Sequence, residues 1–175
     1  MGTVVLDLDE TLGQYNTETK RFQTRPLLRN FLRNVSRNWE VVIFTASLQA
    51  YADVILDDID GNGYISRRFY RNDCTLVEGV PVKDLRKVNS KIDLRRTVIV
   101  DDTPQNFSLH RENGIQIKAF RGGDTSDKEL MKLEKILTVL HNMDDVRVGI
   151  ANIGGQIPQL SARGGSTSQQ TQQQP

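Results

Sequence analysis

The stretch TVVLDLDET, residues 3–11, is an apolar run that ends in two aspartates and a threonine. Three more apolar runs follow along the chain, at residues 41–45, 97–102 and 115–120. Short runs of this kind are typical of strands that are buried on both faces of a parallel sheet. The runs at 41–45 and 97–102 also end in side chains that carry oxygen atoms. We therefore expect a parallel sheet with polar residues gathered at one edge.

Helical patterns lie between these runs. Apolar residues recur at helical spacing over 26–35, 48–59 and 126–140, and a Thr-Pro pair opens a short helix over 103–110. Ser47 is a candidate N-cap, and Ser126 with Glu129 forms a candidate capping box. Strands that alternate with helices predict a three-layer α/β fold around a mostly parallel sheet. Residues 67–83 carry short mixed runs about Glu78-Gly79, which predict a small β-hairpin insertion.

Composition favours one domain followed by a tail. The chain has 175 residues, which suits a single core, and we assign residues 1–150 to it. Residues 151–175 are rich in Gly, Ser and Gln, so we expect them to form a flexible tail. No insertion within the domain is long enough to build a large cap domain over the sheet.

Charge and cysteine content bear on the protein's surroundings. The formal net charge of +1 argues against a protein that binds nucleic acid over its whole surface. Cys74 is the only cysteine, which indicates a reducing, intracellular compartment, either nuclear or cytoplasmic. No apolar run approaches the length of a membrane span. We also expect a monomer.

Residues 58–66, DIDGNGYIS, are similar to the first nine positions of an EF-hand calcium loop. Oxygen ligands fall at positions 1, 3, 5 and 9, and Gly63 lies at position 6. Position 12 should be a bidentate glutamate but is Phe69, and a hairpin rather than a second helix is expected next. We therefore interpret the stretch as a turn between a helix and a strand, which Asp, Asn and Gly favour.

Side chains with related chemistry follow the predicted strands. Ligands of open α/β sheets bind at the carboxyl ends of the strands. The residues expected there, with a lysine from a separate element, are Asp7, Asp9, Thr45, Lys83, Asp101 and Asp102. Carboxylates that converge repel one another unless a cation lies between them, and ligation by oxygen atoms alone suits Mg²⁺. The sequence thus predicts a magnesium site beside a Thr and a Lys that would bind an anionic substrate.

Each of these residue types has a role in phosphoryl transfer. Asp7 is predicted to attack phosphorus and form an aspartyl-phosphate, with Asp9 as general acid and then general base. Thr45 and Lys83 would bind the equatorial phosphoryl oxygens. The predicted Mg²⁺ ligands are Asp7, Asp9 through its backbone carbonyl, and the pair 101–102. Any one of these residues alone is typical of a turn, a cap or a solvated surface, so the prediction depends on their order along the chain.

Five motifs resemble those of the small C-terminal-domain phosphatases, the FCP/SCP branch of the haloacid dehalogenase (HAD) superfamily. They are DLDETL (7–12), FTASLQAYAD (44–53), YRNDC (70–74), VKDL (82–85) and IVDDTPQNF (99–107). The resemblance runs from about residue 4 to residue 147. It implies a HAD-like fold and a Mg²⁺-dependent protein serine/threonine phosphatase that acts on the RNA polymerase II C-terminal domain or another phosphoprotein. It also implies that Arg71 contacts a peptide substrate and that Tyr51 lines a substrate pocket.

One departure from the family pattern concerns the substrate. Relatives carry a longer segment before the helix that begins near residues 25–26, and part of it forms a hydrophobic pocket for a substrate proline. Here residues 13–24 are few and polar, which weakens the case for the RNA polymerase II tail. We interpret Arg67 and Arg68 as solvated charges of the expected hairpin and Arg71 as a functional residue.

Three alternatives remain beside the protein phosphatase. A phosphoacceptor domain of the receiver type also uses Asp, Thr, Lys and Mg²⁺, but its acidic pair lies on the first strand, whereas here the pair follows the lysine. A non-catalytic binding relative, such as the mitochondrial import receptor of the same fold family, is disfavoured by the intact Asp7 and Asp9. A small-molecule phosphatase is disfavoured because a site without a large cap stays open to proteins. Direct binding of nucleic acid is not expected.

Overall fold

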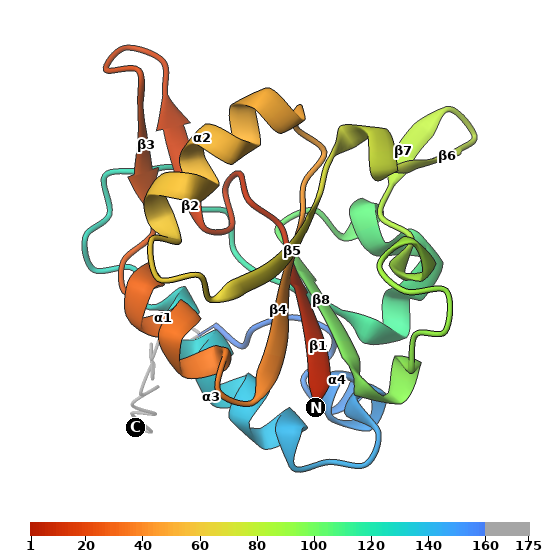
Figure 1. Cartoon of the computed structure of the whole chain (residues 1–175). Helices are drawn as coiled ribbons and strands as arrows, with labels where there is room; N and C mark the ends of the chain where they lie inside the picture. Colours follow the sequence, from red (N-terminus) through yellow and green to blue (C-terminus); the bar gives the residue numbers. More distant parts are fainter. Residues whose placement is uncertain (160–175) are drawn as a thin grey trace, which may run out of the picture.

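Five strands form the central sheet, in the order β5-β4-β1-β8-β9 (Figure 1). The computed structural model describes residues 1–159. The strands of this sheet are β1 (Gly2–Leu6), β4 (Trp39–Phe44), β5 (Ile65–Phe69), β8 (Thr97–Asp101) and β9 (Gly114–Gln116). Every pairing between them is parallel. The three strongest apolar runs of the sequence are therefore the three inner strands, as expected.

Alternate residues of the inner strands belong to different hydrophobic clusters. Val4 and Leu6 of β1 lie in a cluster with the buried faces of the four α-helices. These helices are α1 (Leu28–Val35), α2 (Gln49–Ile59), α3 (Glu129–His141) and α4 (Val146–Asn152). Val5 instead packs with Leu85 of η2 and Phe107 of η4. The four 3₁₀ segments are η1 (Arg71–Asp73), η2 (Leu85–Lys87), η3 (Leu94–Arg96) and η4 (Pro104–Asn113). Because both faces of the sheet are covered, the expected three-layer α/β fold is confirmed.

One predicted hairpin is present, but it is shorter than expected. It consists of β6 (Thr75–Val77) and β7 (Val80–Val82), with the turn at Glu78-Gly79, where both residues have positive φ. Residues 67–69 belong instead to β5 of the main sheet, so the expected span of 67–83 is wrong. Arg67 pairs with Glu40, and Arg68 with two carboxylates of α2. Strand β5 contains Arg67 and Arg68 and so lacks the apolar pattern by which strands are recognised in sequence. These two arginines form ion pairs, and they are not the solvated hairpin charges that we expected.

A second hairpin, which the sequence did not indicate, is formed by β2 (Gly13–Asn16) and β3 (Arg21–Thr24). It projects past α2 at the end of the sheet where the strands terminate (Figure 1). Asn16 Oδ1 accepts hydrogen bonds from the backbone N–H groups of Glu18 and Thr19, at 2.9 and 3.1 Å, and Lys20 has a φ of 55°. Asparagine in this arrangement closes a turn, which explains how so polar a segment forms a hairpin.

Two helix starts differ from expectation. The N-cap of α2 is Leu48 rather than Ser47, and the N-cap of α3 is Lys128 rather than Ser126. In α3 the carboxylate of Asp127 accepts from the backbone N–H of Glu129 in place of the expected capping box. The DIDGNGYIS stretch is a turn from α2 into β5, as interpreted, and Asp60 accepts from two backbone N–H groups there.

The packed part of the chain extends beyond residue 150. Helix α4 continues to Asn152, and Ile157 is buried in the core. The N–H of Gln116 in the edge strand β9 donates to Gly155 O at 2.8 Å, and the N–H of Ile157 donates back to Gln116 O at 3.0 Å. The expected domain end at 150 is therefore wrong for residues 151–159, and residues 160–175 of the expected tail lie outside the described residues. Within residues 1–159, no helix is both long and apolar enough to cross a membrane.

Candidate active site

The predicted site residues meet at the carboxyl ends of three neighbouring strands. Asp7 follows β1, Thr45 follows β4 and Asp101 ends β8, while Lys83 follows β7 of the hairpin. A hollow of about 330 Å³ opens over them, and Asp7, Asp9, Glu10, Thr45, Ser47, Arg71, Asp102 and Asn106 are among the residues that line it. The structure thus brings the predicted acids, threonine and lysine together.

Lys83 lies at the centre of the site and is almost fully buried. Its Nζ donates to Asp7 Oδ1 at 2.8 Å and to Asp101 Oδ2 at 2.6 Å. Burial alone would lower the pKa of the ammonium, but the two carboxylates outweigh burial and hold this pKa above its usual value. Lys83 is therefore positively charged, as its predicted role in binding phosphoryl oxygens requires.

Asp7 is oriented by contacts to both of its carboxylate oxygens. Oδ1 accepts from Lys83, and Oδ2 accepts from the Thr11 hydroxyl at 3.0 Å. Thr11 had no predicted role, although it lies four residues after Asp7 in the same quoted motif. A carboxylate whose two oxygens are held in this way needs little reorganisation before an attack, which suits the role predicted for Asp7.

Asp9 is half-buried and receives a short hydrogen bond from Tyr51, with Oη donating to Oδ1 at 2.6 Å. Burial raises the pKa of Asp9, and the Tyr51 hydrogen bond offsets only part of this effect. A carboxyl with a raised pKa keeps its proton closer to neutral pH, which suits a general acid. Tyr51 therefore contacts the predicted acid/base directly, in addition to the substrate-lining role that the family resemblance implies for it.

Three carboxyl groups form a candidate metal site. Oxygen atoms of Asp7, Asp101 and Asp102 lie within 4.8 Å of one another. Burial raises the pKa of Asp102 to about 8, with further contributions from Asp7, Asp101 and Glu10. Such mutual repulsion is relieved when a divalent cation is bound, and oxygen donors suit Mg²⁺. The residues present therefore fit the predicted ion.

Asp101 differs from the other two acids because it accepts more hydrogen bonds. Oδ1 accepts from the backbone N–H of Thr103 and from Asn106 Nδ2, both at 3.0 Å, and Oδ2 accepts from Asn106 Nδ2 at 3.1 Å as well as from Lys83. Asp7 and Asp102 retain more free acceptor capacity. Within this predicted set of metal ligands, Asp101 thus has the least free acceptor capacity. Sequence reasoning missed Asn106, whose only signal was its place in the 99–107 motif.

Thr45 and Arg71 face the hollow from β4 and η1. The Thr45 hydroxyl lies 2.7 Å from the Ser47 hydroxyl and accepts from the backbone N–H of Ser47 at 3.1 Å. Ser47 therefore supports Thr45 rather than capping a helix. Arg71 is exposed, and its Nε donates to Ala46 O at 2.8 Å, which ties the guanidinium to the rim of the hollow. This position suits the predicted contact between Arg71 and a peptide.

Comparison with known proteins identifies the family. The model of the NLI interacting factor-like phosphatases matches residues 2–147. The chain belongs to this family, and the expected FCP/SCP resemblance is confirmed. It is 39% identical over 163 residues to the CTD small phosphatase-like protein 2 of Dictyostelium discoideum, covering 83% of this chain and 28% of that protein. It is 42% identical over 124 residues to the CTD nuclear envelope phosphatase 1 of Xenopus tropicalis, covering 70% of this chain and 50% of that protein. The chain thus spans half or less of the length of these two relatives.

Solved structures confirm the fold. The structure of Fcp1, described as an essential RNA polymerase II CTD phosphatase, aligns with a TM-score of 0.65 at 18% identity, over 80% of this chain and 62% of that chain. A 3-deoxy-D-manno-octulosonate 8-phosphate phosphatase from Moraxella catarrhalis, solved with magnesium and phosphate ions, aligns with a TM-score of 0.54 at 15% identity, over 87% and 93%. The HAD-like architecture is therefore established for this chain.

Proposed function

We propose that this chain is a Mg²⁺-dependent phosphatase of phosphoserine or phosphothreonine in proteins, and that it works through an aspartyl-phosphate on Asp7. The observation that carries the proposal is the buried Lys83 ammonium, which lies 2.8 Å from Oδ1 of Asp7, a residue that lines the open hollow. Asp9, two residues further on, lines the same hollow with its carboxyl held by Tyr51. Membership of a phosphatase family supports this reading of the site.

The proposed reaction has two steps. In the first, a carboxylate oxygen of Asp7 attacks phosphorus, the bond from phosphorus to the substrate oxygen breaks, and the Asp9 carboxylic acid gives its proton to the leaving oxygen. In the second, water attacks the aspartyl-phosphate and gives a proton to the Asp9 carboxylate, which releases phosphate and restores Asp7. The raised pKa of Asp9, caused mainly by burial, supports its role as the proton donor in the first step.

Charge stabilisation is assigned to groups around the phosphoryl oxygens. The Lys83 ammonium and the Thr45 hydroxyl bind the equatorial oxygens. The attraction of the ammonium and the hydrogen bond of the hydroxyl both strengthen as negative charge develops on these oxygens. Asp7, the backbone carbonyl of Asp9 and the pair 101–102 would hold Mg²⁺. When bound, this ion offsets the repulsion between the attacking carboxylate and the phosphate.

Several properties support a protein substrate. The hollow lies at the open end of the sheet, and no cap domain is present in the described residues to close over it. Arg71 on the rim is placed to contact the peptide backbone or an acidic side chain. Two of the relatives are named for the C-terminal domain or the nuclear envelope, which is consistent with a nuclear or cytoplasmic location. A monomeric state remains our prediction.

Hydrolysis of an aryl phosphate tests the proposal most directly. Wild-type protein and Asp7→Asn are assayed with Mg²⁺ and with EDTA, and turnover is expected only for the wild type with Mg²⁺. Asp58→Asn is the matched control, because it makes the same change at an exposed carboxylate on α2. Its turnover should equal that of the wild type.

Two outcomes would contradict the proposal. Asp7→Asn that retains most of the activity would exclude Asp7 as the nucleophile. A folded wild type that shows no turnover with Mg²⁺ would exclude catalysis and favour a non-catalytic binding protein of the same fold.

A further inference from the structure

The β2–β3 hairpin has two faces of different chemistry. Tyr15 and Phe22 are cross-strand partners, and the Tyr15 ring lies edge-to-face on Tyr51 with 5.8 Å between ring centroids. Gln14 and Gln23 are the next pair of partners, so they point to the opposite side of the hairpin. The first face thus packs toward the catalytic residues. The second face is formed by Gln14, Asn16 and Gln23 and is here called the amide face. Within residues 1–159 its side chains form no aromatic contact like that between Tyr15 and Tyr51.

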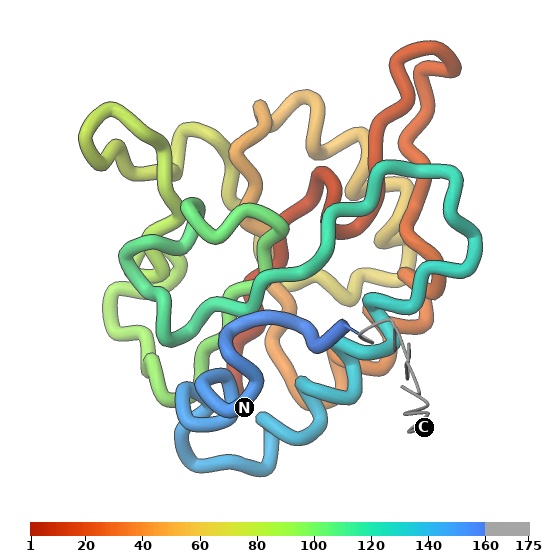
Figure 2. The backbone as a smooth tube through the Cα atoms, turned by 180° about the vertical axis from the view of Figure 1, so that it is seen from behind, coloured from red at the N-terminus to blue at the C-terminus, as the bar shows by residue number. Residues whose placement is uncertain are grey.

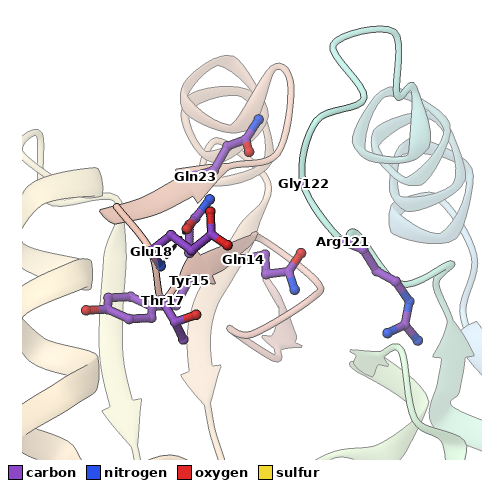
Figure 3. A pocket seen from close by; sticks show the side chains of 8 residues that line it. Gln14, Tyr15, Thr17, Glu18, Gln23, Arg121 and Gly122 are labelled. Carbon is purple, nitrogen blue, oxygen red and sulfur yellow. Dashed lines mark hydrogen bonds between the residues drawn. The ribbon is translucent and has the colours of Figure 1, made fainter. Parts of the chain in front are cut away.

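A hollow of about 330 Å³ lies against the amide face (Figure 3). Its far wall is the loop that carries Arg121 and Gly122, which runs beside the hairpin although about a hundred residues separate them (Figure 2). Figure 3 shows Gln14 between the hairpin and this loop, while the Tyr15 ring points the other way. Thr17 and Glu18 complete the lining near the turn.

The two walls are joined and shaped by specific contacts. The backbone N–H of Gly123 donates to Gln23 Oε1 at 3.2 Å, which ties the loop to the amide face. Gly122 has a φ of 84°, and a Cβ placed on it would lie 3.0 Å from the same oxygen. A side chain at this position would be strained and would press on the wall. The loop is therefore tied to the amide face by one backbone-to-side-chain hydrogen bond, next to a glycine whose backbone conformation disfavours any larger residue.

Hydrogen-bonding groups in the hollow are largely unused. Arg121 has a single ion pair in the described residues, to Glu10 at the long distance of 3.6 Å, and its side chain is 75% exposed. Its guanidinium therefore offers most of its five N–H donors to a ligand. The Gln14 amide also lines the hollow, and it makes no side-chain hydrogen bond within residues 1–159. The lining carries one cation, Arg121, and one acid, Glu18. Lys20 and Arg21, beyond the lining at the hairpin end, form no ion pair within residues 1–159 and add positive charge to this hairpin.

The hollow adjoins the catalytic hollow through Glu10. Glu10 lines the catalytic hollow, and its carboxylate faces Arg121 of the amide-lined hollow. Its φ of 64° is unusual for a residue other than glycine and fixes the chain where the two hollows meet. A polypeptide with its phosphate above Asp7 would thus have its neighbouring residues within reach of Arg121.

We propose that the amide face and Arg121 form a second subsite, which binds the acidic segment of a substrate polypeptide next to its phosphorylated residue. This inference rests on the proposed phosphatase function and extends it to substrate choice. Arg121 pairs with a substrate carboxylate, and the glutamine amides bind the adjacent main chain. The subsite thereby selects polar, acidic sequence on one side of the phosphate.

Three phosphoserine peptides of equal length test the subsite. One carries glutamates before the phosphoserine, one carries them after it, and the third carries glutamines in both places. We expect kcat/KM for one of the two acidic peptides to exceed that for the neutral peptide by about two- to fivefold, as an ion pair with an exposed arginine predicts. In Arg121→Gln this ratio should fall to about one. Gln14→Glu, which places a negative charge on the amide face, should reverse it.

The controls separate this inference from the proposed function. Arg37→Gln makes the same charge change at an exposed arginine before β4, at the other end of the sheet, and should keep the wild-type ratio. Turnover of aryl phosphate without any preference among the peptides would overturn the subsite and leave the phosphatase proposal standing. Anisotropy of the labelled acidic peptides with Asp7→Asn tests binding without turnover, and equal affinity for Asp7→Asn and Asp7→Asn/Arg121→Gln would also overturn the subsite.

Discussion

Two buried cations, Arg25 and Lys83, contact the Asp7–Leu12 motif at different residues and have different roles: Lys83 donates to Asp7, and Arg25 donates to the carbonyl of Thr11. Arg25 forms a two-pronged pair with Asp127, at 2.9 and 3.0 Å, and donates to the carbonyls of Thr11 and Lys118. One positive charge is thus matched by one carboxylate, with backbone oxygens taking the other donors. Lys83 faces two carboxylates, and Asp102 lies beside them.

The difference between them lies in charge balance and not in burial. The side chains of Arg25 and Lys83 are 0% and 1% exposed. The Arg25 cluster is electrically neutral, and protein groups accept the hydrogen bonds of its guanidinium. It therefore joins the loop before α1 to the segment before α3 and leaves no charge for a ligand. The Lys83 cluster has more carboxylates than cations and opens on a hollow, so it retains the capacity to bind a further cation and a phosphate.

The largest expected effect on stability follows removal of Arg25. Arg25→Met leaves Asp127 buried without its partner, and we expect the free energy of unfolding to fall by about 3–5 kcal/mol. Urea denaturation measures this loss. The double variant Arg25→Met/Asp127→Leu should recover much of it, because no charge is then left unpaired. A loss below about 1 kcal/mol would mean that the pair is worth no more than a surface ion pair.

Removal of Lys83 is expected to lower the rate of turnover. Lys83→Met is expected to lower kcat for an aryl phosphate by about 10²–10³-fold, as the loss of one group that stabilises the transition state does. Lys87→Met is the matched control, because Lys87 is exposed on η2. If Lys83→Met stayed within tenfold of the wild type, the two buried cations would not differ as described.

Mg²⁺ should distinguish the two clusters by thermal stability. The ion is expected to stabilise the folded protein by about 2.7 kcal/mol at a hundred times its Kd. Asp102→Asn should reduce this gain, whereas Asp127→Asn should keep it, although that variant is less stable to begin with. Melting curves with Mg²⁺ and with EDTA measure the gain. An equal reduction in both variants would contradict the assignment of the metal to the Lys83 cluster.

Asp84 is a third buried charge and should give the smallest effect. It accepts from the Arg86 side chain at 3.0 and 2.8 Å and faces His110 Nε2 at 3.0 Å. The hydrogen bonds from Arg86 outweigh burial and hold the pKa of Asp84 well below its usual value. The unfolded chain therefore binds a proton that the folded protein does not, and this contribution to stability is lost as the pH falls below about 4.

The variant Asp84→Asn should show a shallower loss of stability with acid than the wild type. Urea denaturation between neutral and acid pH measures the two slopes. Parallel slopes would show that Asp84 titrates normally in the folded protein.

Much of the fold could be predicted because the inner strands are continuous apolar runs. The predicted acids and Thr45 follow from the rule that ligands bind where parallel strands end, whereas Lys83 comes from the separate β6–β7 hairpin. The pairing of Arg25 with Asp127 could not be predicted, because 102 residues separate them and either residue alone is typical of a surface. The same holds for Tyr51 and Asp9, whose contact depends on how α2 lies beside the loop after β1.

The remaining elements could not be predicted because their sequences are polar and lack a hydrophobic pattern. Strand β5 carries Arg67 and Arg68 on an edge, so its sequence resembles a hairpin arm more than a strand of the main sheet. Hairpin β2–β3 buries little apolar surface, and its signal was the Asn16 turn rather than a hydrophobic pattern. Asn106 and Thr11 are ordinary polar residues whose roles depend on the carboxylates that they contact.

The short return of the chain along β9 has a consequence for recombinant work. Residues 155–157 occupy the hydrogen-bonding groups of Gln116 at one end of the sheet. Free strand edges recruit strands of other molecules and promote aggregation. A truncated fragment that stops at residue 150 would keep every predicted catalytic residue, yet it would present an open strand edge to other molecules. A fragment that resists aggregation must therefore continue through Ile157.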